Sequence, residues 1–218
     1  MSQLPVDLTP SLADRLRAAF DIEGKIPRAL EALGPVSGRD VVVIDGDGSP
    51  VTEGIEALGA RVRPAVLDGT NDPDRSLRLD ASDGTADAVV GLWSAFRGPR
   101  PADLAEVDRV LRPAGRHLVI HDYGRDDVSR LFDPDRPEYG AWSHRSGPFL
   151  AGGFRVRVLH CWWTFESLDA AVSFLSEAFP GRGPDVAASL RRPRLAYKVA
   201  VYHRSRGSVP GVPAAAAA

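Results

Sequence analysis

Short apolar runs alternate along this chain with stretches whose apolar residues recur every three or four positions. The most regular example is the β-branched run 41–44, which leads into Asp45-Gly46-Asp47-Gly48 and then into helical spacing from Pro50. Such a run, closed by glycines before a helix, is typical of a buried parallel strand. Ligands of open α/β sheets bind at the carboxyl ends of these strands. This turn is therefore the first candidate for a binding site.

The same alternation continues to the end of the chain. It predicts helices at 10–20, 26–33, 50–58, 101–111 and 167–179, and strands at 40–44, 60–67, 76–79, 87–92, 117–120, 154–165 and 195–203. Pro64 cannot donate a ladder hydrogen bond, which places the second strand at or near an edge. Strands that alternate with helices predict an α/β fold with a mainly parallel, doubly wound sheet.

Three regions follow from these elements. Residues 1–35 hold two helices without evident chemistry, which we expect to pack beside the sheet or to form a lid over its cleft. Residues 36–205 form the α/β domain. Residues 206–218 end in an alanine run, and we expect a disordered tail there.

Composition narrows the classes of partner. The chain has 218 residues and a formal net charge of −2, so its charge gives no reason to expect nucleic acid or an anionic membrane as partner. Cys161 is the single cysteine, and no run approaches the roughly twenty apolar residues of a membrane span. The first residues lack a signal-peptide pattern. We expect a cytoplasmic protein with a small-molecule substrate.

Two stretches together resemble class I S-adenosylmethionine-dependent methyltransferases. The first is the strand with its G-D-G turn. The second, which is the more specific, is D-G-T-A-D-A-V-V-G-L-W-S-A-F followed by L-A-E-V-D-R-V-L-R-P-A-G-R-H-L-V-I at residues 83–96 and 104–120. The likeness covers roughly residues 36–203. It implies a Rossmann-like fold whose mainly parallel sheet ends in a C-terminal antiparallel strand, and it implies S-adenosylmethionine as cofactor.

The resemblance also implies positions for cofactor contacts. In this family the glycine turn approaches the methionine part of the cofactor, which corresponds here to residues 45–48. An acid that ends the second strand holds the ribose hydroxyls, and Asp68 stands at that place. A carboxylate suits ribose because it accepts two hydroxyl hydrogen bonds. Asp80 or Asp83 would lie on the adenine side, and Trp93 would form a wall of the site or pack in the core.

Residues after the fourth and fifth strands of the family pattern are the candidates for chemistry. His121 could act as a general base, because its ordinary pKa lies near neutral pH. Asp122 or Tyr123 could orient the methyl acceptor. His121 could equally be a strand-end residue bonded to the backbone. Tyr139, in the irregular segment 133–148, suits substrate recognition or core anchoring.

Departures from the family pattern leave other functions open. Ile44 stands where the family usually has an acid, and the segment between the second and fourth strands is short. A catalytically degenerate protein that binds a cofactor, a nucleoside or a protein partner is the main alternative.

A third hypothesis rests on the sequence D-G-D-G-S, which also looks like the first motif of D-x-D-type phosphatases. Under that hypothesis Asp126 and Asp127 would help to hold magnesium, but the lysine that such an enzyme needs is missing between Asp47 and Asp126. The histidines show no metal-ligand spacing, and so we expect no metal site.

The strand expected at 154–165 carries two tryptophan side chains that suit packing. In 160–163, alternation directs Cys161 and Trp163 to one side and His160 and Trp162 to the other. Core packing or a homodimer contact is the expected role.

Overall fold

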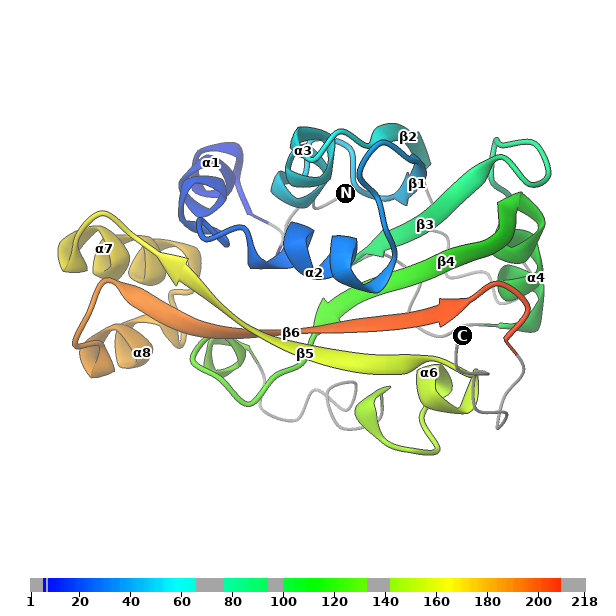
Figure 1. Ribbon diagram of the computed structural model, residues 1–218. Helices are drawn as coiled ribbons and strands as arrows, with labels where there is room; N and C mark the ends of the chain where they lie inside the picture. Colours follow the sequence, from blue (N-terminus) through cyan, green and yellow to red (C-terminus); the bar gives the residue numbers. More distant parts are fainter. Residues whose placement is uncertain (1–5, 7, 66–76, 94–99, 133–141, 209–218) are drawn as a thin grey trace.

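A computed structural model describes residues 6, 8–65, 77–93, 100–132 and 142–208. Within them the chain forms one six-stranded sheet in the order β2-β1-β3-β4-β6-β5 (Figure 1). The strands are β1 (Asp40–Ile44), β2 (Arg61–Ala65), β3 (Ala86–Leu92), β4 (Leu111–Asp122), β5 (Arg155–Thr164) and β6 (Arg194–Ser205).

The direction of the strands matches the sequence-based prediction. β2, β1, β3 and β4 run parallel to one another, whereas β6 is antiparallel to β4 and to β5. Among the described strands, β2, which contains Pro64, pairs with β1 alone and forms an edge, as expected. The prediction of a Rossmann-like, mainly parallel sheet with a C-terminal antiparallel strand is confirmed.

Helices cover both faces of this sheet. The elements α1 (Pro10–Ala19), α2 (Lys25–Leu33), α3 (Pro50–Ala57), α7 (Leu168–Ala178) and α8 (Gly183–Ser189) pack against one face, which we call face A. The opposite face, face B, carries α4 (Pro101–Val110) and α6 (Pro148–Ala151). A 3-10 turn, η1 (Val128–Leu131), follows β4. Each face has its own apolar core, because side chains on successive strand residues point to opposite sides.

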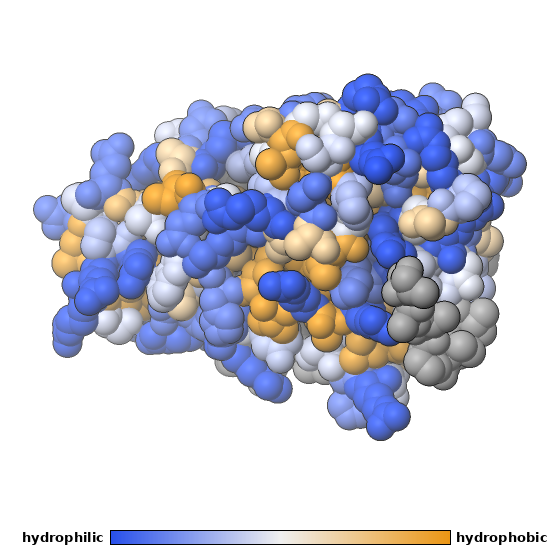
Figure 2. All heavy atoms as spheres, viewed as in Figure 1, coloured by the Kyte–Doolittle hydropathy of each residue, from blue (hydrophilic) through white to orange (hydrophobic). Residues whose placement is uncertain are grey.

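Apolar residues also gather on part of the outer surface. Figure 2 shows hydrophobic side chains gathered over β5 and β6 near the middle of the face, with hydrophilic side chains around them. No helix among the described residues is long and apolar enough to cross a membrane.

Several predicted boundaries are wrong. Residues 77–79 do not form a strand; instead the backbone N–H groups of Leu77 and Leu79 donate to Asp103 and Glu106 of α4. β4 is longer than predicted and begins directly after α4, at Leu111. The short helices α6 and α8 lie in segments for which no helix was predicted. Tertiary contacts decide these short elements, because local propensity alone is weak.

Candidate functional site

The candidate site lies at the point where the strand order of the sheet reverses. β1 pairs with β2 on one side and with β3 on the other. The helix after β1, α3, packs on face A, whereas the helix after β3, α4, packs on face B. Consecutive connections therefore leave the sheet on opposite faces, which makes the carboxyl ends of β1 and β3 the switch point of the sheet; we call this place the crevice. In open α/β sheets this is where ligands bind.

The turn after β1 brings its backbone to this crevice. Asp45 and Gly48 both adopt positive φ angles, of 54° and 64°. The N–H group of Asp45 still donates to the carbonyl of Ala65 at 2.8 Å, so the turn begins directly at the end of the ladder. Asp47 and Gly48 are exposed. Ser49 then caps α3 by accepting a hydrogen bond from the N–H of Val51.

Gly46 differs from the rest of the turn because the chain itself fills the space beside it. A Cβ atom at this position would lie 2.2 Å from Cγ1 of Val43, 2.7 Å from Oγ1 of Thr52 and 2.8 Å from Cδ1 of Leu92. The Thr52 hydroxyl also donates to the Gly46 carbonyl at 2.6 Å. Close packing of the turn therefore explains this glycine without a ligand.

The first helix reaches the same turn. On α1, Arg17 donates from Nη1 to the carbonyl of Gly48, and the same nitrogen lies 3.6 Å from Oε1 of Glu53 on α3. The guanidinium thus places a positive charge beside the exposed part of the turn. The N-terminal helices pack against face A, and α1 contacts the candidate site directly.

A polar and aromatic cluster stands at the ends of β3 and β4. The Asp122 carboxylate accepts a hydrogen bond from Nε1 of Trp93 at 3.1 Å and another from the hydroxyl of Tyr197. Trp93 has a φ of 41°, which is uncommon for an aromatic residue. Burial, followed by the neighbouring Asp122 charge, holds the pKa of the Tyr197 phenol well above its usual value.

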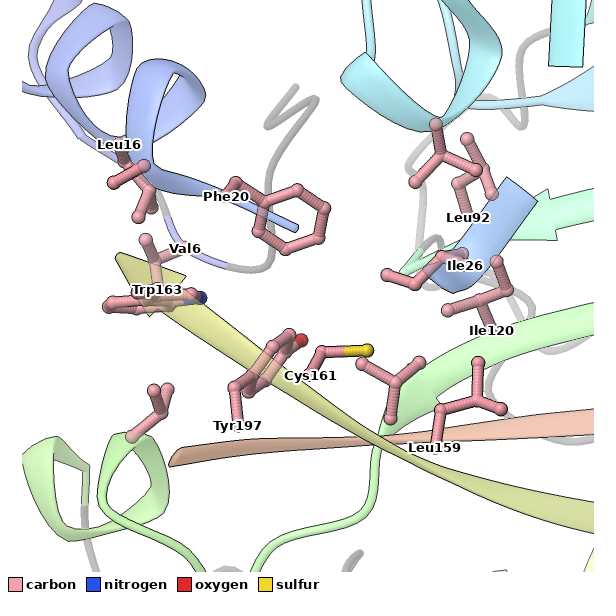
Figure 3. Packing of buried hydrophobic residues seen from close by; sticks show 14 of the residues in the cluster. Val6, Leu16, Phe20, Ile26, Leu92, Ile120, Leu159, Cys161, Trp163 and Tyr197 are labelled. Atoms are coloured by element: carbon pink, nitrogen blue, oxygen red, sulfur yellow. The ribbon is translucent and has the colours of Figure 1, made fainter. Parts of the chain in front are cut away.

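Phe20 closes this cluster from the end of α1. Its ring meets Trp93 edge-on at a centroid distance of 5.6 Å and lies 6.0 Å from the ring of Tyr197. Figure 3 shows Phe20 at the end of α1, above Tyr197 of β6 and Trp163 of β5. Phe20 also forms a β-bridge with Trp163. Four segments far apart in sequence therefore meet beside Asp122.

His121 and Tyr123 lie on the other side of the sheet. The imidazole of His121 is buried at 4% exposure, with its centroid 4.4 Å from the Trp142 ring and 5.6 Å from the Phe149 ring. Tyr123 packs at the edge of the same face B core. Successive strand residues alternate sides, so the structure separates His121 from Asp122.

The predicted acids do not all reach the crevice. Asp68 lies outside the described residues. Asp83 is exposed and pairs with Nη1 of Arg109 at 2.6 Å, just before the amino end of β3. Asp80 lies between Leu79 and Ala81, whose carbonyls accept from the same Arg109 in the last turn of α4. Both acids therefore lie near the amino end of β3, at the end of the sheet opposite to the crevice.

The residues proposed for magnesium have other partners. Asp126 accepts a hydrogen bond from the backbone N–H of Lys198, and Asp127 accepts one from that of Ala196. Both carboxylates thus fix the loop after β4 to β6. Among the described residues, no group of three or more histidine, cysteine or acidic side chains could hold a metal ion.

Sequence reasoning missed Arg17, Phe20 and Tyr197. Each was assigned to a helix or strand, and the local pattern gave no sign that these side chains converge on the turn and on Asp122. The alternation in β5 was predicted correctly: Cys161 and Trp163 are buried, whereas His160 is exposed.

Comparison with known sequences is weakly informative. No family model matches the chain. A 75-residue stretch is 29% identical to the mitochondrial lipoyl synthases of Ajellomyces capsulatus and Coccidioides posadasii. It covers 34% of this chain, and the match spans only 17% and 18% of those two proteins.

Solved structures resemble the whole fold. A protein from Anaeromyxobacter dehalogenans assigned as a type II methyltransferase has a TM-score of 0.52 and 16% identity, over 86% of this chain and 97% of that one. An S-adenosylmethionine-dependent methyltransferase from Aquifex aeolicus gives 0.48 and 15%, over 90% and 98%. Geranyl diphosphate C-methyltransferase from Streptomyces coelicolor gives 0.44 and 15%, over 85% and 79%. At 16% identity the likeness to the Anaeromyxobacter protein concerns the fold alone, and together with the sheet topology it gives the protein a class I methyltransferase-like fold.

Proposed function

We propose that this protein transfers a methyl group from S-adenosylmethionine to a small molecule. The observation that carries the proposal is the convergence at one crevice of the turn 45–48 and Trp93, which follow β1 and β3, with Asp122, which ends β4. That crevice is the switch point of the sheet, where the backbone of the turn and an aromatic ring are both within reach of a ligand.

The residues present fit the cofactor in two respects. Asp47 and Gly48 expose the backbone of the turn, and the Arg17 guanidinium beside Gly48 suits the carboxylate of the methionine part. Trp93, which is half-buried, offers a flat apolar surface to an adenine or an acceptor. When bound, the cofactor would supply an electrophilic methyl group on a sulfonium sulfur.

The task of the chain is then to position the acceptor. Transfer between two held partners depends mainly on alignment, because fixing both reactants removes much of the entropic barrier. The Asp122 carboxylate, oriented by Trp93 and Tyr197, is placed to accept a hydrogen bond from an acceptor O–H or N–H group. His121 stays a prediction from the sequence; its burial on face B favours Asp122 for this role.

Cofactor or nucleoside binding without transfer is the second candidate. The packing around Gly46 favours it, since Val43, Thr52 and Leu92 already occupy the space that the glycine leaves. The two candidates share a binding site and differ in turnover.

The test begins with calorimetric and thermal-shift titrations of S-adenosylmethionine and S-adenosylhomocysteine, with NAD as the control ligand. A ligand at a hundred times its dissociation constant should stabilise the protein by about 2.7 kcal/mol. Trp93→Phe should weaken binding of either sulfur ligand. The matched variant is Trp162→Phe on β5, where the Trp162 ring lies under Arg194 of β6; it should leave binding unchanged.

Release of S-adenosylhomocysteine is then measured with a panel of small hydroxyl and amine acceptors. Product formation supports the transferase. Binding without product over the whole panel favours the second candidate. Failure of both sulfur ligands to bind would rule out methyl transfer and binding of this cofactor.

A further inference from the structure

A basic cluster lies at the opposite end of the sheet from the crevice. Arg116 on β4, His203 on β6, and Arg155 and Arg157 on β5 come from three adjacent strands. Arg155 pairs directly with His203, which pairs on its other side with Leu118. Arg155 and Arg157 are exposed, whereas Arg116 and His203 are half-buried.

The register places all four side chains on face A. Leu118 belongs to the apolar core of that face, and directly paired residues in a sheet share a side. Arg116 is two residues before Leu118, and Arg157 is two residues after Arg155, so both side chains emerge on the same side. Adjacent strands lie about 4.8 Å apart, and alternate residues lie roughly 7 Å apart along a strand. The four side chains therefore emerge from an area of the sheet that is comparable in size to a diphosphate group and its surroundings.

No acid offsets this charge within the described part of the chain. Arg116 donates to the hydroxyl of Ser205, and none of the three arginines forms an ion pair with a described carboxylate. His203 faces Arg155, Arg116 and Arg157, and these charges, after burial itself, lower the pKa of its imidazole. Other arginines of the chain do have acidic partners: Arg112, for example, bridges Asp40 and Asp87.

Such an arrangement costs free energy unless an anion is present. Like charges on neighbouring positions of a sheet repel one another. The end of α2 lies beside Arg116, because a Cβ on Gly34 would come within 2.8 Å of Cβ of Arg116. A helix C-terminus favours one nearby cation, which accounts for Arg116 and leaves the two arginines of β5 unexplained.

We propose that Arg116, Arg155, Arg157 and His203 form a binding site for a small phosphate-bearing ligand. Guanidinium groups match phosphate oxygens through paired, charge-assisted hydrogen bonds, and three of them suit a multiply charged anion better than a single carboxylate. His203 lies among them as a switchable donor, which gains a proton when the anion arrives. This site is separate from the proposed cofactor crevice and does not depend on it.

The probe is inorganic pyrophosphate, titrated at constant ionic strength and followed by calorimetry. Saturable binding is expected, and Arg155→Gln combined with Arg157→Gln should weaken it at least about tenfold, because each charged hydrogen bond contributes on that order. The matched control combines Arg191→Gln with Arg192→Gln. These two exposed arginines precede β6 at the far end of the sheet and carry the same charge.

A second readout follows His203 by NMR, with His203→Gln to assign its signal. Bound pyrophosphate should raise the pKa of His203, while the NMR signal of the exposed His160 on the same sheet should not move when pyrophosphate is added. Absence of saturable binding would overturn the proposal, as would an equal loss in the control pair or an unmoved His203 titration. Binding of S-adenosylhomocysteine to the Arg155/Arg157 variant, measured in parallel, keeps this outcome independent of the methyltransferase proposal.

Discussion

Two residues with side chains hold left-handed backbone conformations beside the crevice. Asp45 and Trp93, with φ angles of 54° and 41°, follow the carboxyl ends of β1 and β3. Non-glycine residues in this region cost on the order of 1 kcal/mol or more, and they persist where the surroundings hold them. Here the ladder bond to Ala65 holds Asp45, and the bond from Nε1 to Asp122 holds Trp93. Backbone strain is therefore present at the proposed site, as it also is at Asp21, Ala114 and Arg125 among the described residues.

The packing of Gly46 leads to the first prediction. Gly46→Ala should lower the free energy of unfolding by about 1–3 kcal/mol, because the added methyl group overlaps Val43, Thr52 and Leu92. Chemical denaturation measures the change. Gly181→Ala is the control, since no atom lies within 4 Å of its Cβ position, and a change below about 0.5 kcal/mol is expected. Equal effects at the two positions would contradict the packing argument.

The Tyr197 hydroxyl leads to the second prediction. Tyr197→Phe keeps the buried ring but removes the hydrogen bond to the Asp122 carboxylate, and it should cost about 1.5–3 kcal/mol of stability. Tyr202→Phe is the matched control on the same strand. The Tyr202 ring stacks on Phe149 at 4.2 Å, and its hydroxyl makes no hydrogen bond within the described residues, so a change near zero is expected. A large loss in both variants would show that the hydrogen bond to Asp122 is not the cause of the effect at Tyr197.

At the scale of elements, the sequence predicted what periodicity can encode. β1, β3 and the pair β5 and β6 have long apolar or alternating patterns, and the structure confirms them. The prediction of a strand at 76–79 is wrong because the backbone N–H groups of Leu77 and Leu79 donate hydrogen bonds to side chains of α4 instead of to a neighbouring strand. α8 was missed because seven residues carry too little pattern; its position depends on Gly183, which packs against the carbonyl of Leu175 on α7.

The contact between α1 and the glycine turn leads to the third prediction. Arg17→Ala removes the hydrogen bond to the Gly48 carbonyl and should raise amide exchange in α1 and in residues 45–49 by about 3- to 10-fold, with a modest loss of about 0.5–1.5 kcal/mol. Exchange measured by mass spectrometry tests this. Arg28→Ala serves as the control, because Arg28 donates to the nearby carbonyl of Glu23 and does not touch the turn. Unchanged exchange at the turn would show that α1 does not hold it.

At the scale of the whole molecule, the candidate site is a product of tertiary contacts. Phe20, Trp93, Asp122 and Tyr197 are spread over most of the chain, and they meet only because β3, β4 and β6 are adjacent and α1 packs across them. The sequence named Trp93 and Asp122 because they end strands. It gave no sign of Phe20 or Tyr197, since a buried aromatic on a strand looks the same whether or not its hydroxyl meets a carboxylate.

Buried ionisable groups give the fourth prediction, a dependence of global stability on pH. His117, on face B, is fully buried beside Arg204, and burial, followed by that charge, holds the pKa of the imidazole well below 6.5. The unfolded chain binds a proton there near pH 6.5 and the folded protein does not. The free energy of unfolding is therefore at its full value above this pH and falls as the pH decreases toward 5. His203, whose pKa is also lowered, acts in the same direction.

Denaturant unfolding between pH 8 and pH 5 measures this slope. His117→Phe should flatten it, since the ring would fit among apolar neighbours such as Phe154, whereas His144→Gln, at an exposed position, should not change it. Below pH 4.5 a second loss is expected in both variants. Arg109 lowers the pKa of Glu106 to about 2, and Arg61 with Arg112 lowers that of Asp40 to about 2. The stability that these carboxylates supply is present above their unfolded values of 4.5 and 3.8 and disappears as the pH falls toward 2. A slope between pH 8 and pH 5 that survives in His117→Phe unchanged would assign the dependence to other groups.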